Sequence, residues 1–157
     1  MNRSSVILIA LMVLFVISCD SGRVYESDYD FEDQSWNMDV MPSFEFQVDE
    51  ISNNDLILKI RNSLDFPFRN CYMTYYLEDS IGNTLTSDLV NFQLFDETTG
   101  KPFGKGNSVF QHSETILSQY DFPSPGMYRL KVAQYMRKTD LEGTYSVGLR
   151  IEKSDQD

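Results

Sequence analysis

The residue with the clearest chemistry in this sequence is Cys19. It follows an apolar run of 12 residues (6–17) and the small residue Ser18, and Arg3 precedes the run; together these form a secretory signal. A small residue followed by cysteine at this point resembles the bacterial lipobox, in which the cysteine is acylated and becomes the new N-terminus. A membrane-spanning helix would need about 20 apolar residues. We therefore expect a lipoprotein signal peptide over residues 1–18 and a covalent lipid on Cys19, with no other cofactor.

The same segment predicts where the protein resides. Several buried acyl chains hold a protein durably on a membrane, so we expect a cell-envelope lipoprotein whose folded part faces the periplasm. Asp20 occupies a position that directs sorting in some bacteria, but the rule does not transfer between phyla, and the choice of inner or outer membrane stays open. The chain carries 24 acidic and 13 basic residues, a net charge of −11. This balance argues against a nucleic-acid partner, because phosphate binding needs clustered Lys and Arg.

The sequence lacks the combinations of residues that catalytic and metal-binding sites require. His112 is the single histidine and has no cysteine or histidine at metal-ligand spacing, which argues against a transition-metal site. We expect it to be a solvated loop residue. Ser113 lies next to it without the Gly-x-Ser-x-Gly elbow of a hydrolase. With Cys19 acylated, Cys71 has no disulfide partner, and its apolar, aromatic surroundings predict a buried strand residue. These features predict a non-enzymatic protein with no small-molecule substrate.

One glycine-rich loop carries a candidate contact residue. Residues 100–106 lack the Ser or Thr that a phosphate-binding loop places after its lysine. Loops on a rigid scaffold often carry recognition residues. Phe103, flanked by Lys101 and Lys105, is therefore a candidate interaction residue.

A second loop combines Phe66, Pro67, Phe68 and Arg69. Two aromatic rings and an arginine between strands have the composition of an interface anchor. The alternative is that both rings cap the open end of the core, which is favoured because aromatic side chains are buried more often than displayed. Both interpretations keep these four residues as candidates.

Residues 19–42 have the composition of a linker. The segment is rich in acidic residues and has no clear periodicity over its first part. The acidic cluster 28–33 does not fit a calcium-binding loop, because Asp33 occupies the position of the required glycine. We expect a lipidated, acidic, flexible tether, of which some 20 residues would reach about 25 Å.

From residue 43 to residue 157, alternation of apolar and polar residues predicts a β domain. The expected strands are 44–48, 56–61, 71–78, 84–86, 90–94, 108–111, 115–120, 126–137 and 143–153. The first two look like a hairpin around Asn53-Asn54. The spacing of these short strands by turn signals predicts an antiparallel β-sandwich of the jelly-roll or immunoglobulin-like kind.

Arg61, Arg137 and Arg150 fall on the polar sides of their expected strands. If those strands lie in one sheet, the three side chains form a basic stripe that could dock an acidic partner. Cross-strand pairing with acidic or tyrosine neighbours is the favoured alternative.

Several short segments, in order and spacing, carry a family resemblance. They are Cys19, Ile60-Arg61-Asn62, Phe66-Pro67-Phe68-x-Asn70, Gly104-x-Gly106, Pro125-Gly126-x-Tyr128, Gln134-Tyr135-Met136-Arg137, Leu141-x-Gly143 and Val147-Gly148-Leu149-Arg150-Ile151-Glu152-Lys153. Over nearly its whole length the chain resembles the gliding-motility lipoprotein GldH family of the Bacteroidota. Ser146 and Phe103 stand where an acidic residue and a tryptophan would be expected. A role that depends on those expected side chains therefore does not carry over to these two positions.

The resemblance implies a non-enzymatic envelope lipoprotein required for surface gliding. It also implies an association with the type IX secretion system, the exporter of the mobile surface adhesins. The implied partners are the membrane, through the lipid, and other gliding or secretion proteins, for which the domain would act as a tethered accessory or scaffold.

Two rival functions follow from the residues. A carbohydrate-binding β-sandwich would need coplanar exposed aromatics, drawn from Tyr72, Tyr75, Tyr76 and Trp36, although Tyr75 and Tyr76 point to opposite faces of a strand. A chaperone for exported strands would need an open, uncharged edge strand.

Overall fold

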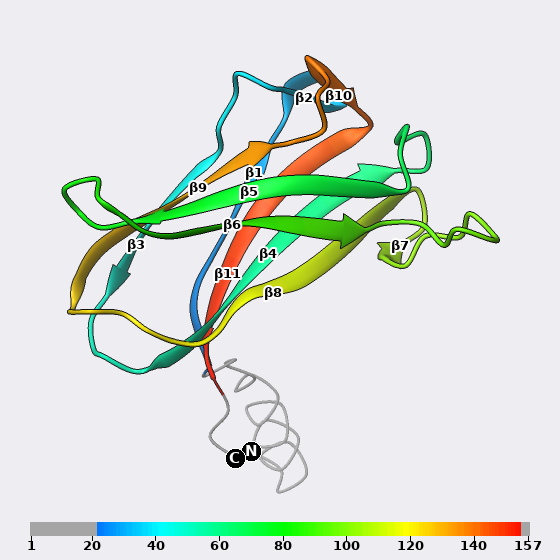
Figure 1. Cartoon of the computed structure of the whole chain (residues 1–157). Helices are drawn as coiled ribbons and strands as arrows, with labels where there is room; N and C mark the ends of the chain where they lie inside the picture. The colour runs from blue at the N-terminus through cyan, green and yellow to red at the C-terminus, as the bar shows by residue number, and fades with distance from the viewer. Residues whose placement is uncertain (1–21, 155–157) are drawn as a thin grey trace, which may run out of the picture.

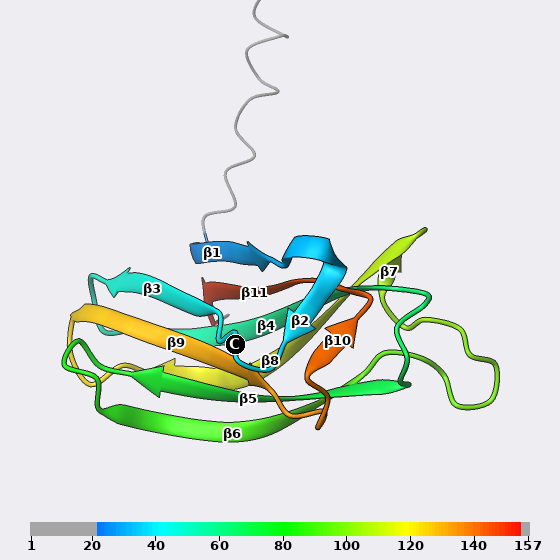
Figure 2. The same ribbon diagram turned by 90° about the horizontal axis from the view of Figure 1, so that it is seen from above.

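The fold consists of two antiparallel β-sheets packed face to face, with a small two-stranded sheet at one end (Figure 1, Figure 2). The computed structural model describes residues 22–154. Its elements are β1 (Arg23–Asp30), the 3-10 helix η1 (Glu32–Gln34), β2 (Ser35–Asn37), β3 (Ser43–Val48), β4 (Asn53–Ser63), β5 (Asn70–Glu78), β6 (Thr84–Gln93), β7 (Lys105–Gly106), β8 (Val109–Asp121), β9 (Gly126–Gln134), β10 (Asp140–Glu142) and β11 (Thr144–Lys153). The predicted all-β, antiparallel sandwich is confirmed. Cys19 and the expected signal peptide lie outside the described residues.

The sheets are built mainly from strands that are distant in sequence. The five-stranded sheet has the order β1-β11-β4-β8-β7, the four-stranded sheet β3-β9-β5-β6, and the small sheet β10-β2. Among the described strands, β5 with β6 and the short β7 with β8 are the pairs that follow each other directly in the chain. The fold therefore depends on pairing between the two ends of the chain, above all between β1 and β11.

The expected hairpin of the first two strands is wrong. β3 pairs with β9, whereas β4 pairs with β11 and β8, so the two strands lie in different sheets. Asn53 and Asn54, the expected turn, are the first residues of β4, and residues 49–52 carry the chain between the sheets. Alternation reports which face of a strand is buried, but this pattern is the same for any partner strand.

Some expected strands are also joined or shortened. The weak segments 108–111 and 115–120 form one long strand, β8, and the segments around 84–94 form β6. β9 ends at Gln134, so Arg137 lies beyond it.

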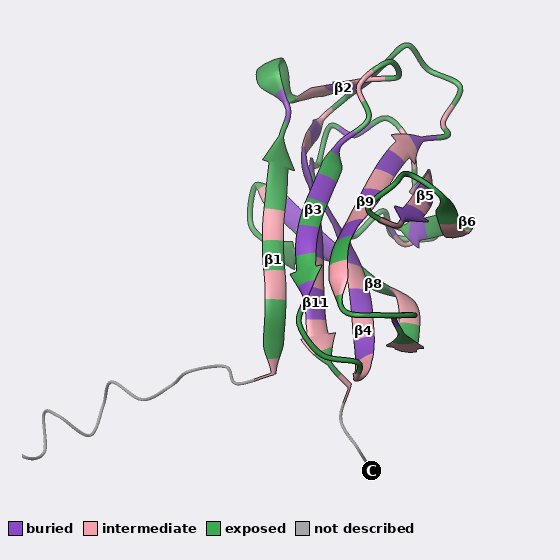
Figure 3. Cartoon of the chain, turned by 90° about the vertical axis from the view of Figure 1, so that its left-hand side faces the viewer, coloured by how far each residue is buried: buried purple, intermediate pink, exposed green. Residues whose placement is uncertain are grey.

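The core lies between the two large sheets, and along their strands buried residues alternate with more exposed ones (Figure 3). Phe46, Phe122 and Tyr128 form an aromatic cluster, with ring centroids 4.7 Å apart for Phe122 and Tyr128. Cys71 on β5 is fully buried, as predicted, and burial raises the pKa of its thiol to about 12.

The expected flexible tether over residues 19–42 is wrong from Arg23 onward. β1 is an edge strand of the five-stranded sheet, paired with β11 from Arg23↔Glu152 to Asp30↔Ser146. After β1, the ring of Phe31 stacks on Trp36 at 5.0 Å, and the Trp36 side chain is completely buried. The folded domain therefore begins by Arg23 and not at residue 43.

The side chain of Lys59 passes over Gly148 and holds β1 against the rest of its sheet. Lys59 projects from β4, and its Nζ donates hydrogen bonds to Glu26 (2.7 Å) and Asp28 (3.3 Å) on β1. β11 lies between these strands, and its Gly148 is opposite both Asp28 and Lys59. A Cβ at position 148 would lie 1.9 Å from Asp28 Oδ1 and 2.7 Å from Lys59 Cε. The missing side chain of Gly148 therefore provides the path by which Lys59 reaches both carboxylates.

Gly148→Ala should destabilise the domain by about 1–3 kcal/mol, because the added methyl group overlaps the Asp28 carboxylate and displaces Lys59. Urea unfolding at neutral pH measures the loss. Ser146→Ala, on the same strand and face, is the matched control. The Ser146 hydroxyl is buried without a hydrogen-bond partner, so its removal should leave the stability unchanged or raise it slightly. Equal stability of the Gly148→Ala variant and the wild type would contradict the crossing.

Glu26→Gln should weaken the fold at neutral pH but not in acid. The hydrogen bond from Lys59 lowers the pKa of Glu26 below the ordinary value of a glutamate carboxyl group. The carboxylate therefore stabilises the fold above that value, and the contribution is lost as the pH falls through the lowered pKa. Urea unfolding should show a deficit of about 1 kcal/mol at pH 7 that disappears towards pH 3. A deficit that is constant over this range would argue against the charged contact.

Candidate functional site

The loop of Phe66, Pro67, Phe68 and Arg69 supplies the core more than the surface. Phe66 is 5% exposed and belongs to the core, and Phe68 packs against it with ring centroids 6.2 Å apart. Pro67 and Arg69 are exposed. The Arg69 carbonyl oxygen accepts hydrogen bonds from the backbone amides of Leu94 and Phe95, which fixes the loop. The capping interpretation accounts for Phe66, and the outward residues Pro67 and Arg69 stay candidates.

Phe103 lies beside a polar groove. Its side chain is 61% exposed, and the groove, of about 580 Å³, is also lined by Lys105, His112, Glu114 and Arg150. The groove combines one apolar ring with charges of both signs, so its chemistry does not select a single class of ligand.

His112 is not the solvated loop residue that we expected. It lies on β8 and is buried, because its neighbour Gly104 has no side chain; a Cβ there would lie 2.6 Å from His112 Nε2. Burial lowers the pKa of His112, which favours the neutral imidazole. Its Nε2 is buried and has no hydrogen-bond partner among the described residues.

The three arginines do not form one stripe. Arg61 on β4 and Arg150 on β11 belong to the five-stranded sheet, and Arg150 forms an ion pair with Glu152. Arg137 follows β9 of the other sheet. Alternation placed each residue on a polar face but could not assign the strands to sheets.

Arg137 instead belongs to an aromatic hollow on the outside of the four-stranded sheet. The hollow, of about 350 Å³, is lined by Tyr72, Leu89, Tyr135, Met136 and Arg137. Tyr72 points outward from β5, between the buried Cys71 and Met73, and Leu89 is exposed on β6. We call these five residues the aromatic hollow. The sequence analysis named Tyr72 only as a possible sugar-binding aromatic, and Tyr135 and Met136 only as part of the family resemblance. It did not bring them together with Arg137, and it missed Leu89; the outward position of Tyr72 within the alternation of β5 was the available signal.

The turn that carries Tyr135 and Arg137 is held rigidly. The buried side chain of Gln134 accepts a hydrogen bond from the amide of Met136 (2.9 Å) and donates one to the carbonyl oxygen of Lys138. The Tyr135 amide donates to the Tyr72 carbonyl oxygen at 2.8 Å, and the Tyr72 amide lies 3.1 Å from Met136 Sδ. These contacts hold Arg137 in the left-handed region, with φ of 56°. Tyr135, 60% exposed, is thus displayed from a fixed backbone.

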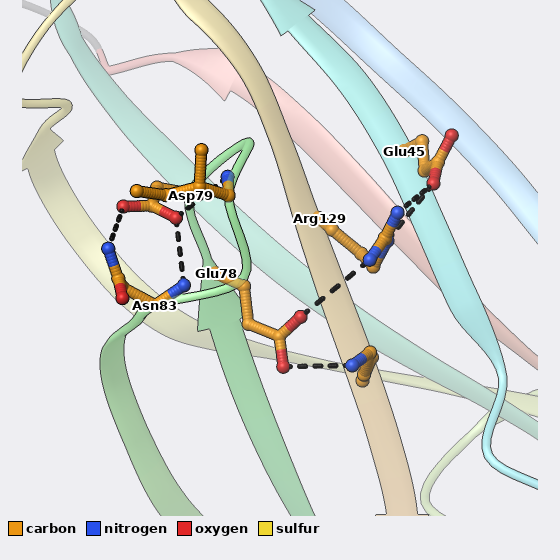
Figure 4. A network of polar contacts seen from close by, with 7 residues as sticks. Glu45, Glu78, Asp79, Asn83 and Arg129 are labelled. Carbon is orange, nitrogen blue, oxygen red and sulfur yellow. Dashed lines mark hydrogen bonds and ion pairs between the residues drawn. The ribbon is translucent and has the colours of Figure 1, made fainter.

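The other end of the same sheet face is a network of charges (Figure 4). Arg129 on β9 lies between Glu45 on β3 and Glu78 on β5, and Lys131 donates to Glu78 at 2.9 Å. In the adjoining turn, hydrogen bonds led by that from the Asn83 side chain lower the pKa of Asp79. The cations and anions of this network pair with each other, whereas the aromatic hollow combines exposed tyrosine rings with the charge of Arg137.

The residues proposed for a sugar platform are not arranged as one. Trp36 and Tyr75 are buried in the core, whereas Tyr72 lines the aromatic hollow and Tyr76 is half-buried. Of the four, only Tyr72 and Tyr76 share the outward face of β5, so the four rings do not form one platform.

Within residues 22–154 no group of three or more His, Cys, Asp and Glu side chains is placed to hold a metal ion. Nor does this part of the chain contain a helix with the length and apolar character required to span a membrane.

Gln134→Ala should loosen the turn of the aromatic hollow more than the sandwich. Loss of both side-chain hydrogen bonds removes about 1–2 kcal/mol of local stability, so amide hydrogen exchange at Met136 should accelerate by about tenfold or more. Gln47→Ala is the matched control, since Gln47 lies on an exposed face of β3 and should leave this exchange unchanged. Unaltered exchange at Met136 in the Gln134→Ala variant would show that other contacts hold the turn.

Comparison with known proteins identifies the family. A family model described as GldH lipoprotein matches residues 23–151. A protein of Christiangramia forsetii named gliding motility lipoprotein GldH homolog is 28% identical over 160 residues, covering 96% of each chain. The gliding motility lipoprotein GldH of Flavobacterium johnsoniae is 27% identical over 162 residues, covering 98% of each. Among solved structures, the VP2 subviral particle of infectious bursal disease virus matches with a TM-score of 0.38 and 12% identity, over 85% of this chain and 31% of that chain. The family match begins in β1 and ends two residues before the end of β11, and the chain therefore belongs to the GldH lipoprotein family.

Proposed function

We propose that this lipoprotein is a non-enzymatic, lipid-tethered accessory or scaffold component of gliding motility in the cell envelope. Membership of the GldH family supports the motility role, since both relatives carry gliding motility in their names. The lipobox at Cys19 supports attachment to a membrane with the domain facing the periplasm. The association with the type IX secretion system belongs to the same proposal and follows from the family resemblance.

The observation that carries the scaffold role is the aromatic hollow. Tyrosine and arginine are over-represented among residues that dominate binding energy, and here both are displayed from a turn held by hydrogen bonds. A surface that is already ordered loses little conformational entropy on binding. These properties are those of a protein-binding surface.

The condition of the reactive side chains supports a non-enzymatic role. Burial lowers the pKa of His112 and raises that of Cys71 to about 12. A nucleophilic cysteine needs a lowered pKa, and a histidine base needs access to its substrate. Cys71 does not meet the first condition, and His112, although it lines the groove beside Phe103, is itself buried and has no hydrogen-bond partner at Nε2.

Gene replacement in the host bacterium tests the proposal. Deletion should abolish colony spreading and reduce export of surface adhesins. A Cys19→Ala variant should lose labelling by radioactive palmitate, leave the membrane fraction and fail to restore spreading. A double variant, Tyr135→Ser with Arg137→Ser, should keep the lipid and the fold but restore spreading poorly. Met127→Ser, an exposed position on β9 at the other end of the sheet, is the matched control and should restore it fully. Normal spreading and normal export in the deletion strain would refute the proposed function.

A further inference from the structure

The two large sheets have four edges, and three of them carry several features that oppose pairing with another strand. An open edge strand is a template for strand addition, which proteins block with charges, bulges, prolines or short length. On β1, the acidic residues Glu26, Asp28 and Asp30 follow one face, and the register shifts between Arg23 and Tyr25.

The edges formed by β3 and β8 are protected in other ways. β3 has only six residues, follows Pro42 and carries Glu45 in an ion pair with Arg129. β8 is partly covered by β7 and has two register shifts against β4. It also carries Glu114 and, near its end, Gln119 with φ of 50°.

β6 has fewer of these protections among the described residues: a register shift at its start, opposite Leu77 and Glu78, and one charge, Asp88, whose carboxylate accepts a hydrogen bond from the Leu89 amide. It has ten residues, contains no proline and carries a single charged side chain, Asp88. Its register with β5 is unbroken from Asn70↔Gln93 to Leu77↔Thr86. In the described part of the chain β6 pairs with β5 alone, and Figure 2 shows it as the outermost strand of its sheet.

The open edge and the aromatic hollow share a residue. Leu89 lies on β6 and lines the aromatic hollow. It is 48% exposed, and its partner in the register is the outward residue Thr74. In a strand added alongside β6, every second side chain therefore lies on the same outward face as Leu89, Tyr72 and Arg137. One of these side chains can lie next to Leu89. Strand addition of this kind gives affinity through the backbone and specificity through pockets for alternate side chains.

The charges indicate the chemistry of the added strand. Of the described residues that line the aromatic hollow, Arg137 is the one with a charged side chain, so a carboxylate on the added strand complements it. A second copy of this chain fits poorly. Symmetric antiparallel pairing of two β6 strands would bring their Asp88 side chains together, in chains that each carry a net charge of −11.

We propose that β6 is a strand-addition site for an extended segment of another exported protein. The segment places an apolar side chain and a neighbouring carboxylate over the aromatic hollow. This inference rests on the proposed scaffold function only for the source of the segment, an envelope partner.

The full-length protein, purified in detergent, allows a direct test by amide hydrogen exchange. The probe is a ten-residue peptide with blocked ends, alternating Thr and Val, with one Phe and one Glu at its centre. We expect amides of β6 to exchange at least tenfold more slowly when the peptide is at saturation. A peptide in which two central residues are proline should give no protection. The proposal is overturned if β6 gains no protection at millimolar peptide, or if β1 gains as much as β6.

Variants separate the edge from the aromatic hollow. Leu89→Lys should weaken peptide binding at least tenfold. Val24→Lys, an exposed apolar position on the edge strand β1, is the matched control and should leave binding within twofold of the wild type. Replacing the peptide's Glu by Gln should weaken binding about two- to fivefold, the range expected for an exposed ion pair. Arg137→Gln should abolish that difference. Equal effects of Leu89→Lys and Val24→Lys would overturn the assignment to β6.

A photoreactive amino acid at position 89 or 24 extends the test to living cells. Position 89 should cross-link to one extended segment of a second protein, and position 24 should not. Equal yields at the two positions would count against the proposal. The peptide measurements do not depend on motility. If they fail, the strand-addition site on β6 is overturned, whereas the spreading phenotype still decides the proposed function.

Discussion

The ammonium group of Lys59, placed between Glu26 and Asp28, is the contact on which the arrangement of this domain depends. It ties the first described strand to a sheet that is otherwise completed by strands from the middle and the end of the chain. A charge that is almost buried must be compensated, and only β1 supplies these carboxylates. The inward rings of Tyr25 and Phe31 then close the same side of the core against Phe46 and Trp36. The polar contact and the aromatic contacts thus secure opposite faces of one edge strand.

This contact also explains where reasoning from sequence succeeded and where it failed. Strands whose outward residues meet solvent, such as β3 and β11, alternate clearly and were found within one or two residues of their observed bounds. β1 was missed because its outward acidic residues resemble a solvated linker. Tyr25, Tyr29 and Phe31 did alternate with Glu26, Asp28 and Asp30, although Tyr29 is itself exposed, and the partner Lys59 lies more than 30 positions away. The meaning of the acidic residues therefore became visible only in three dimensions.

The candidate site shows a similar division. Single residues such as Arg137 and Phe103 were identified by residue type, but their neighbours in space depend on which strands share a sheet. The sheet assignment separated Arg137 from Arg61 and Arg150 and joined it to Tyr72, Leu89 and Tyr135. His112 was judged by its neighbours in sequence, whereas its burial results from the close approach of Gly104. Strand order is set by long-range pairing, which local alternation does not encode.

The early start of β1 has a mechanical consequence for a lipid-anchored protein. Four peptide units separate Cys19 from Arg23, and a chain of that length spans at most about 14 Å, about half the reach expected of a flexible tether. β1 starts and β11 ends at the same end of the sandwich (Figure 1), where the Lys153 amide donates to the Gly22 carbonyl oxygen. With acyl chains on Cys19, this end would be moored at the headgroups and the small β2-β10 sheet would be the far end. The domain would then be held close to the bilayer surface and would not move freely on a long tether. Force applied to its side would be transmitted to the membrane through β1.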